Sequence, residues 1–551
     1  MRFASPRTAF PLGVAAIAFA FLGLFLLYPL FNVFKASFYD PTGTTLTLAN
    51  YAKVLSAAFY RAGLTNSLII GVSATIATIV VGVPMAFCLA RLPVPGKPLL
   101  LALATMPLVL PSFVGAYAWV LLLGRAGIVS QGLAWLGVPG VSIYGKPGLI
   151  LVFTLQTFPY VLLPTLAAFK AVDVSIEEAG QNLGASRWRT FRLVTLPVVM
   201  PAVLAGGLLV FMETLENFGV PFVLAEDMPI LAVQAYKLFI GEMGANPASA
   251  GVMGVLLIAC TSGALLLQRY YLARRRFATG ARGAPPLLSV GRGWRMASAV
   301  FCWGVVLLAL VPFFAVVVIS FMKFRGPVLT WTPGLDNFAT LFARSQQPLI
   351  NTLMLASAAA AGATLIGVPI GYVLTRYRSG LSHVLDVVAM VPFAVAGTVL
   401  AIGLVISFNS GWLILTGGWL ILVLAYLVRK LPFSVRASAA ILHQIDPSLE
   451  EASINLGVSP ARTFYQLTVP LMAGGVIGGT ILTWVTVASE LSATVVLYSG
   501  PWATMTVVMF QALEGTSAGI ASAAATLLIV VTVVPLALVH RLLKNRDVSV
   551  L

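Results

Sequence analysis

Long apolar runs alternate with short polar connections along the whole chain. Each run holds about 20 mostly apolar residues, which is enough for a helix to cross about 30 Å of hydrocarbon at about 1.5 Å per residue. The pattern predicts an all-α integral membrane protein with about twelve transmembrane helices. The expected spans lie near residues 10–34, 65–90, 98–123, 146–169, 198–218, 249–271, 297–321, 351–375, 384–408, 412–428, 472–490 and 515–540.

The composition fits a lipid environment. Of 551 residues, 59% are hydrophobic and 9% are charged, whereas about a quarter of the residues are charged in an ordinary soluble domain. The first run is longer than a signal-peptide core and no small-x-small cleavage site follows it, so we expect it to be retained as a helix. Cys88, Cys260 and Cys302 lie within or beside apolar runs without metal-ligand spacing, so we expect packing roles for them.

The net charge of +16 reflects topology rather than nucleic-acid binding, because the Lys and Arg residues sit in short connections between the apolar runs. A cytoplasmic N-terminus, with Arg2 and Arg7, places most of these residues in the cytoplasm, as membrane proteins prefer. An even number of spans then returns the C-terminus, with Arg541, to the same side. We therefore expect both termini in the cytoplasm.

The chain contains two tandem copies of one six-helix unit. Matching positions first recur at an offset of 285 residues, as in Gly82-Val83-Pro84 with Gly367-Val368-Pro369 and Arg91 with Arg376. Beyond the third span the offset is 273, as in Glu177-Glu178-Ala179 with Glu450-Glu451-Ala452. The outer loop around 124–147 is therefore longer than its counterpart around 409–411.

The repeat predicts the domain organisation. We expect a first six-helix domain at 1–271, a basic cytoplasmic linker at 272–296 and a second six-helix domain at 297–551. Because each copy has an even number of spans, the copies share one orientation and should be related by a pseudo-two-fold axis along the membrane normal. A transport pathway would follow that axis.

The longest polar stretch of each copy has one pattern. It predicts a helix, a sharp turn that glycine permits, and a second amphipathic helix that proline ends before the next span. The first copy reads Glu178-Ala179-Gly180, three residues, Gly184, nine residues and Val194-Thr195-Leu196-Pro197; the second reads Glu451-Ala452-Ser453, three residues, Gly457, nine residues and Leu467-Thr468-Val469-Pro470.

These residues resemble the cytoplasmic coupling loop of binding-protein-dependent ABC importer permeases, whose pattern is Glu-Ala-Ala, three residues, Gly, nine residues, Ile-x-Leu-Pro. The departures keep a small or aliphatic character. The alternative is a pair of amphipathic loops without a partner. The resemblance implies docking on two copies of a cytoplasmic ABC ATPase through Glu177, Glu178, Ala179, Gly184, Glu450, Glu451, Ala452 and Gly457.

The ATPase is expected on separate subunits. The sequence contains no G-x-x-x-x-G-K-[ST] phosphate loop, and Gly96-Lys97 and Gly145-Lys146 are each followed by Pro. We therefore expect a transport permease rather than an enzyme, which binds no cofactor itself while partner subunits use ATP. Since the chain has no long soluble region, an extracytoplasmic substrate-binding protein is a further expected partner. The resemblance places the chain in the bacterial cytoplasmic (inner) membrane.

Ionisable residues at membrane depth are candidates for contact with cargo. Glu213 and Glu216 share a helical face with Asn217, and Asn217 corresponds to Glu490 in the second copy. Carboxylate oxygens suit hard cations such as Fe³⁺. The alternative is that these acids lie at the outer helix ends, in water or paired with Arg, and bind no cargo. The specific metal ligands stay unknown.

The fused twelve-span form, with segments such as Glu213 to Gly219 and Glu490 to Thr494, looks most like permeases of the ferric iron group, which includes relatives for aminoethylphosphonate and thiamine. Few Lys or Arg residues fall deep in the expected spans, so ferric iron is favoured over a phosphonate or another small solute. A secondary transporter would show the same repeat. A membrane enzyme is disfavoured because His383, His443 and His540 stand isolated in the sequence.

Overall fold

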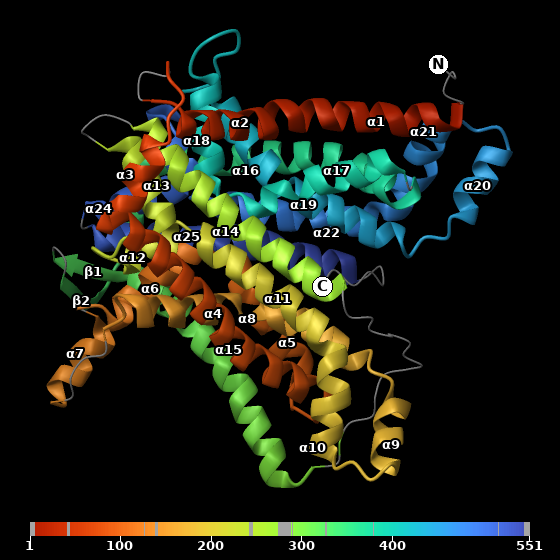
Figure 1. Cartoon of the computed structure of the whole chain (residues 1–551). Helices are drawn as coiled ribbons and strands as arrows, with labels where there is room; N and C mark the ends of the chain where they lie inside the picture. Colours follow the sequence, from red (N-terminus) through yellow and green to blue (C-terminus); the bar gives the residue numbers. More distant parts are fainter. Residues whose placement is uncertain are drawn as a thin grey trace. The chain divides into compact units, whose positions relative to one another are not determined.

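A computed structural model describes the chain over residues 6–40, 44–125, 127–137, 142–241, 246–273, 288, 290–325, 328–377, 379–515 and 517–544 (Figure 1). Arg2 and most of the expected linker, residues 274–287, lie outside the described residues. Apart from one two-stranded hairpin, the regular elements of the described part are helical.

In the described part of the first copy, every helix or strand element is a helix. Its spans and connections are α1 (Pro6–Leu22), η1 (Gly23–Leu27), α2 (Tyr28–Phe38), α3 (Ala49–Ser56), α4 (Ala58–Arg91), α5 (Lys97–Val109), α6 (Ser112–Leu123), α7 (Ile128–Trp135), α8 (Lys146–Lys170), α9 (Val174–Asn182), α10 (Arg187–Thr190), η2 (Phe191–Thr195), α11 (Leu196–Glu216), α12 (Gly219–Leu224), α13 (Leu231–Ile240) and α14 (Pro247–Ala273).

The second copy repeats this order and adds an antiparallel hairpin after its first span. Its elements are α15 (Arg292–Ser320), β1 (Met322–Arg325), β2 (Val328–Pro333), α16 (Asp336–Arg376), α17 (Gly380–Met390), η3 (Val391–Ala394), α18 (Gly397–Phe408), α19 (Trp419–Leu442), α20 (Ser448–Asn455), α21 (Pro460–Thr463), η4 (Phe464–Thr468), α22 (Val469–Ala488), α23 (Thr494–Leu497), η5 (Gly500–Trp502), α24 (Met505–Glu514) and α25 (Ala518–Lys544).

Equivalent elements begin at equivalent residues, which confirms the duplication. The helices α8 and α19 start at Lys146 and Trp419, and the helices α6 and α18 start at Ser112 and Gly397. These starts follow the offsets of 273 and 285 residues found in the sequence. The longer outer loop of the first copy carries α7, whereas its counterpart between α18 and α19 carries no helix.

The all-α membrane fold is confirmed, but the bounds of several spans differ. Ten helices of the described chain are long and apolar enough to cross a membrane, or eleven if the bent pair α17–η3 and α18 is one span. That pair bends by 106°, so the expected continuous span at 384–408 is wrong. The expected span at 98–123 is also broken, because Leu110 is held extended before Pro111.

The fourth expected span of the second copy falls on α19, which is not among those ten helices. It was expected at 412–428, but α19 begins at Trp419 and ends at Leu442. Three cations, Arg429, Lys430 and Arg436, lie inside this helix. The apolar pattern stops at Arg429 while the helix continues, so the hydropathy of the sequence underestimated its length.

Packing divides the chain into two compact units, and each is described separately. Unit 1 contains residues 1–52, 235–255 and 320–551, and unit 2 contains 53–234 and 256–319. The first span of each copy therefore packs with the later spans of the other copy. In unit 1, α2 packs against α18, where the Asn32 side-chain amide donates to Ser407 Oγ at 2.8 Å. In unit 2, Trp303 Nε1 of α15 donates to the Pro95 carbonyl at 3.1 Å.

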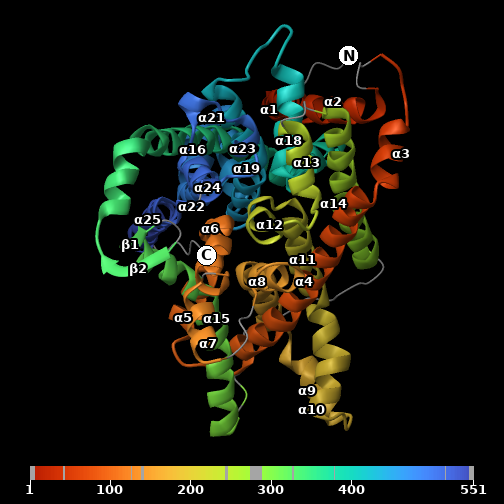
Figure 2. The same ribbon diagram turned by 90° about the vertical axis from the view of Figure 1, so that its left-hand side faces the viewer.

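Each unit has a core of three equivalent helices. In unit 1, α16, α19 and α22 pack together and α1 lies beside α16 and α17 (Figure 1). In unit 2, α4, α8 and α11 form the same group (Figure 2). Gly82 faces Val161 and the equivalent Gly367 faces Ser434, so a side chain at either glycine would crowd the neighbouring helix. The three cysteines are free thiols.

Candidate functional site

The two polar stretches form helical elbows of the same design. The first elbow is residues 172–197, built on α9, α10 and η2, and the second elbow is residues 445–470, built on α20, α21 and η4. Each begins with an aspartate that accepts a hydrogen bond from a backbone amide, at 2.9 Å for Ser175 N to Asp173 Oδ1 and for Ser448 N to Asp446 Oδ1. The bond from the Ser448 amide also lowers the pKa of the exposed Asp446 below its ordinary value.

The expected glycine turns are confirmed. Gly184 has φ +84° and Gly457 has φ +88°, in the left-handed region that costs other L-residues roughly 1–2 kcal/mol. A Cβ at either position would meet no atom within 4 Å, so the backbone conformation rather than crowding explains the glycine.

The prolines at the ends of the elbows do not stop the helix, contrary to expectation. Arg187–Glu216 and Pro460–Ala488 each run as one apolar span through Pro197 and Pro470. A π-helical turn precedes each proline, at η2 and at η4. In the first elbow the Leu196 amide donates to the carbonyl of Phe191, five residues earlier, whereas an α-helical amide donates to the carbonyl four residues earlier. This wider turn shifts the local bonding register, so the helix continues despite the amide that proline lacks.

In the first elbow, Glu177 faces its own unit instead of solvent. Its Oε1 lies 2.7 Å from Arg91 Nη2 at the end of α4 and accepts a second hydrogen bond from Thr195 Oγ1 at 2.7 Å. The Arg91 side chain is 4% exposed and that of Glu177 16%. The ion pair therefore ties α9 to the end of the second span and to η2.

The second elbow repeats this arrangement. Glu450 Oε1 lies 3.0 Å from Arg376 Nε, and Glu450 Oε2 accepts a hydrogen bond from Tyr372 Oη at 3.1 Å. Arg376 also donates to the carbonyl of Ile445 at 2.9 Å. Arg91 and Arg376 recur at the repeat offset in the sequence, but their pairing with Glu177 and Glu450 was not predicted.

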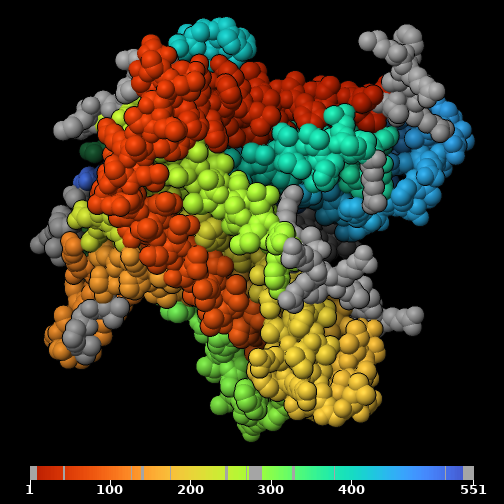
Figure 3. Space-filling model, viewed as in Figure 1, coloured from red at the N-terminus to blue at the C-terminus, as the bar shows by residue number. Residues whose placement is uncertain are grey.

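The outer face of each elbow presents an acidic residue beside apolar ones. Glu178, Ala179, Glu451 and Ala452 are exposed. Leu183, directly before Gly184, is 89% exposed, and the equivalent Leu456 is 85% exposed. In the space-filling view the first elbow lies at the surface of its unit (Figure 3). Exposed leucines thus recur at matching positions in both copies, although the sequence motif did not single them out.

The residues of the first copy that we expected to line the pathway lie at the end of α11. Glu213 and Glu216 are partly buried within the helix, whereas Asn217 ends it with extended backbone and is buried. The Asn217 amide donates to Ser112 Oγ at 3.2 Å, and its oxygen accepts from the Val220 amide at 2.9 Å. Asn217 thus holds the start of α6 and the turn after α11 together. A cargo-binding role for these residues stays a prediction.

Glu490 has a different environment. Its carboxylate forms an ion pair with Arg429 and lies 3.5 Å from Lys430 Nζ, and the side chains of Glu490 and Arg429 are 6% and 10% exposed. The expected span ended at residue 428, so Arg429 and Lys430 were not expected to lie inside a helix. Because α19 extends past residue 428, two cations lie near its midpoint.

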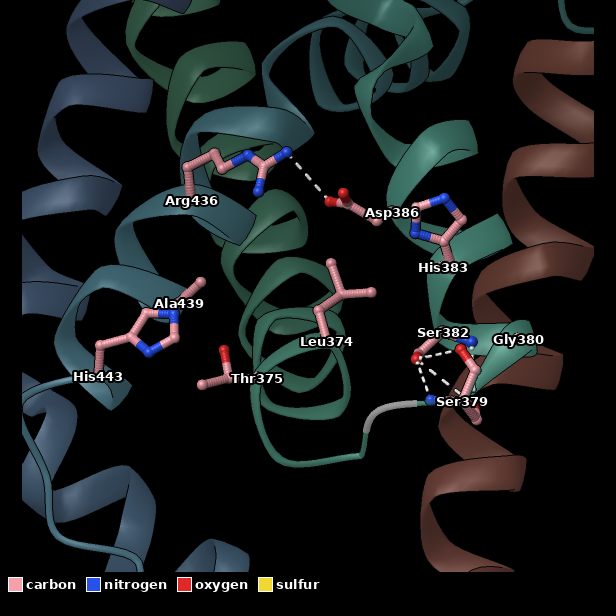
Figure 4. Close-up of a pocket in the computed structure, with 10 residues that line it drawn as sticks. All are labelled: Leu374, Thr375, Ser379, Gly380, Ser382, His383, Asp386, Arg436, Ala439 and His443. Carbon is pink, nitrogen blue, oxygen red and sulfur yellow. Dashed lines mark hydrogen bonds and ion pairs between the residues drawn. The ribbon is translucent and has the colours of Figure 1, made fainter. Parts of the chain in front are cut away.

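A pocket of about 480 Å³ lies in unit 1 between the ends of α16, α17 and α19 (Figure 4). His383 and His443, isolated in the sequence, both line it, and Arg436 forms an ion pair with Asp386 at 3.1 Å across one side. No group of three or more His, Cys, Asp or Glu in the described part of the chain is arranged to hold a metal ion. The pocket thus offers polar lining without a metal centre.

Comparison with known proteins identifies two matching regions. The profile of the family described as "Binding-protein-dependent transport system inner membrane component" matches residues 78–277 and again 363–546. The two matches contain the two elbows, in agreement with the duplication.

Two relatives that match most of this chain carry ferric transport names. The chain is 28% identical over 518 residues to the ferric transport system permease protein FbpB of Actinobacillus pleuropneumoniae, covering 92% of this chain and 74% of the relative. It is 28% identical over 484 residues to the putative ferric transport system permease protein FbpB 1 of Haemophilus influenzae, covering 86% and 76%. A chain of the bacterial alginate ABC transporter in complex with an alginate-bound periplasmic protein is 19% identical, covering 49% of this chain and 94% of that one, with a TM-score of 0.39.

Proposed function

Because this chain belongs to the family of binding-protein-dependent transport system inner membrane components, we propose that its two elbows couple transport to ATP hydrolysis by two copies of a separate cytoplasmic ABC ATPase. The chain itself is the multi-pass permease of an ABC importer. An extracytoplasmic binding protein delivers the cargo, and both termini of the chain lie in the cytoplasm with the elbows.

One observation carries the coupling proposal, namely that the same two-sided elbow occurs twice. Its inner side is anchored by the Arg91–Glu177 and Arg376–Glu450 ion pairs. Its outer side exposes Leu183 and Leu456. A segment that is fixed to a membrane helix on one side and open on the other transmits movement of a bound subunit to that helix. Two equivalent elbows fit two equivalent ATPase subunits.

The exposed residues of the motif and the residues held in the ion pairs have different roles. Glu178, Ala179, Glu451 and Ala452 are exposed and would contact the ATPase directly. Glu177 and Glu450 are turned toward their own unit, so they act as positioning residues and not as contacts. Gly184 and Gly457 set the angle between the two arms of each elbow. The chain contributes no nucleotide site of its own to this scheme, and ATP is used by the partner subunits.

We propose ferric iron as the cargo. The support is the name of relatives that match 92% and 86% of the chain. The partly buried cations Arg429 and Lys430 remove the earlier reason for disfavouring an anionic solute. Aminoethylphosphonate and other small solutes therefore remain alternatives for the experiment.

Purification of the assembled complex tests the coupling proposal. The full chain, tagged and expressed in its own host, is purified in mild detergent, and ATP hydrolysis by the preparation is measured. We expect Mg-ATP hydrolysis that disappears from preparations of a Leu183→Ser/Leu456→Ser variant, while the chain itself is recovered in equal amount. Hydrolysis that is absent from the unmodified preparation, or unaffected by the substitutions, would contradict the proposal.

A further inference from the structure

The pocket in unit 1 lies on the side of the second elbow, where three helices begin or end. There α16 ends at Arg376, α17 begins at Gly380 and α19 ends at Leu442. The pocket volume of about 480 Å³ falls in the range of about 300–1,000 Å³ that small-molecule sites have. Its lining comes mainly from the first turns of α17 and the last turns of α19 (Figure 4). A ligand in it would therefore contact both helices.

Side chains that carry N–H groups dominate the lining. Arg436 and His443 come from α19 and its end, and His383 comes from α17 (Figure 4). Neither imidazole forms a hydrogen bond within the part of the chain that the structure describes. Asp386 is the only acid among the described lining residues, and it pairs with one guanidinium nitrogen of Arg436 at 3.1 Å. Because a guanidinium has five N–H donors, others remain for a ligand.

The start of α17 favours the same kind of ligand. Ser379, Gly380 and Ser382 line the pocket, and Ser379 Oγ accepts a hydrogen bond from the Ser382 amide at 3.2 Å. The N-terminal end of a helix carries a partial positive charge, which attracts anions. The donor side chains and the helix end together therefore favour an anion over a cation in this pocket.

The equivalent place in the first copy is also basic. Lys170 corresponds to His443 at the offset of 273, and Lys97 corresponds to Ser382, the neighbour of His383, at the offset of 285. The two lysines lie close enough for their charges to repel each other. Within the described residues, neither forms an ion pair with an acid. An anion beside them would relieve this repulsion, so both copies gather basic groups at the same corner of their unit.

The ion pair beside the pocket occurs in the second copy alone. At the repeat offsets of 285 and 273, Leu101 and Leu163 stand where the second copy has Asp386 and Arg436. The helices α5 and α8 of the first copy pack together, as α17 and α19 do. The helix contact therefore does not need the charges, and the ion pair is a feature of the pocket instead of the fold.

An apolar stripe on α17 begins beside the pocket. Leu381, Val384 and Val387 are exposed and lie three residues apart, so they share one side of the helix. His383, in the first turns of the same helix, lines the pocket. A basic pocket next to an exposed apolar helix surface matches the two parts of a phospholipid, because a headgroup phosphate can enter the pocket while acyl chains lie along the stripe.

We propose that Arg436, His383 and His443 bind a phosphate group, and that an anionic phospholipid supplies it. Guanidinium and imidazole N–H groups form strong hydrogen bonds to phosphate oxygens, and basic pockets between membrane helices recognise anionic headgroups. Free phosphate has the same chemistry and is the second source to be tested. The site does not depend on the cargo, and only its assignment to the cytoplasmic leaflet rests on the proposed orientation of the chain.

The second elbow begins directly beside this site. His443 lies two residues before Ile445, the first residue of the elbow, and the Ile445 carbonyl accepts a hydrogen bond from Arg376 at 2.9 Å. Thr375, the neighbour of Arg376, also lines the pocket. A bound phosphate would therefore join α17 to the end of α19 at the base of the elbow and hold that base in one position.

Chemical modification of the histidines tests the site without transport or ATP. The chain has three histidines, of which His383 and His443 line the pocket and His540 serves as the internal control. The purified full chain in detergent reacts with diethylpyrocarbonate, with and without inorganic phosphate, and mass spectrometry gives the rate at each histidine. We expect phosphate at about ten times its dissociation constant to slow the reaction of His383 and His443 roughly tenfold, and to leave His540 unaffected.

A variant that copies the first copy provides the comparison. Arg436→Leu with Asp386→Leu keeps both histidines as reporters and should lose most of the protection. Arg125→Gln, which breaks an exposed ion pair of the first copy, should be protected like the unmodified chain. Absent protection of His383 and His443 in the unmodified chain would overturn the proposal even if the double variant did not fold. Equal protection in a folded double variant would also overturn it.

Vesicles of two compositions distinguish the sources of the phosphate. The full chain is reconstituted in phosphatidylcholine with or without phosphatidylglycerol, and the same modification rates are measured. Protection of His383 and His443 by phosphatidylglycerol identifies the anionic lipid as the source. Protection by free phosphate alone supports the site and assigns it to a soluble oxyanion. Equal protection in both vesicles would show shielding by the bilayer and contradict the lipid source, and protection by neither probe would overturn the site.

Discussion

Glu177 Oε1 lies 2.7 Å from Arg91 Nη2, although the two residues are 86 positions apart in the chain. The ion pair joins the first helix of an elbow to the end of a membrane span, and Glu450 with Arg376 forms its equivalent in the second copy. Both sides of each pair are largely buried. The elbows are therefore not loose loops, because each is fixed to a long helix of its own unit.

Breaking one of these anchors should uncouple transport from hydrolysis. Removing one partner of a buried ion pair costs about 3–5 kcal/mol, because the other charge is left buried and unpaired. Glu450→Gln should therefore loosen the second elbow and lower the amount of cargo moved per ATP hydrolysed. The measurement is the ratio of vesicle uptake to phosphate release. Exchanging the charges, as Arg376→Glu with Glu450→Arg, should recover part of that ratio, whereas equal ratios for Glu450→Gln and the unmodified chain would show that the anchor has no role in coupling.

The exposed acids should act by a different route. Glu178 and Glu451 lie on the solvent side of the elbows, so Glu178→Ala with Glu451→Ala should leave membrane insertion unchanged and weaken stimulation of ATP hydrolysis. Exposed single ion pairs contribute about 0.2–1 kcal/mol each, so the expected loss of affinity is a few-fold. The measurement is the ATPase activity of the unmodified chain and of the variant at increasing salt concentration. Uptake at the unmodified rate would contradict a contact role for these carboxylates.

The apolar face of the elbows should contribute more to docking. Burying a leucine is worth about 1.5–3 kcal/mol, which corresponds to roughly a ten-fold to hundred-fold change in affinity per elbow. Leu183→Ser with Leu456→Ser should therefore reduce recovery of ATPase activity with the tagged chain. Leu136→Ser provides a control, since Leu136 is 66% exposed but lies after α7, outside the elbows. An equal loss in the control would point to general damage instead of a docking face.

Substitutions at the elbow glycines distinguish the effect of the positive φ angle from the effect of steric crowding. At Gly184 and Gly457 a Cβ meets nothing within 4 Å, so alanine should act only through the positive φ, at roughly 1–2 kcal/mol. Asparagine tolerates this conformation better than alanine. We expect the paired Ala variants to reduce ATP-driven uptake more than the paired Asn variants. If the Asn variants were the more impaired, the glycines would be required for close approach of the partner and not for the angle.

The sequence allowed the repeated architecture and the turns of the elbows to be predicted because both depend on local residues. Apolar runs mark spans, and Gly184 and Gly457 mark left-handed turns. The partner of Glu177 was not predictable in this way, because the pairing joins distant segments of the fold. Pro197 and Pro470 were wrongly predicted to end a helix. Each is accommodated by a preceding π-turn, and the sequence pattern does not reveal such a turn.

Arg429 and Lys430 show a second limit of prediction from the sequence. Arg429 and Lys430 ended the apolar pattern, so the span was stopped at residue 428, yet α19 continues to Leu442. Both pair with Glu490, a residue about 60 positions later in the chain. A hydropathy rule therefore misses helix residues whose charges are compensated by a distant segment. Comparison of the two copies position by position would have revealed the substitution of Gln156, Thr157 and Asn217 by three charges.

The energy source of uptake separates an ABC importer permease from a secondary transporter. Inside-out and right-side-out vesicles carrying the full chain and its host partners are loaded with or without Mg-ATP, and ionophores that collapse proton and sodium gradients are added before radioactive ferric citrate. We expect uptake that needs ATP on the side of the elbows, survives the ionophores and disappears in the Leu183→Ser/Leu456→Ser variant. Uptake that persists without ATP and stops when the gradients collapse would identify a secondary transporter and rule out an ATP-driven importer.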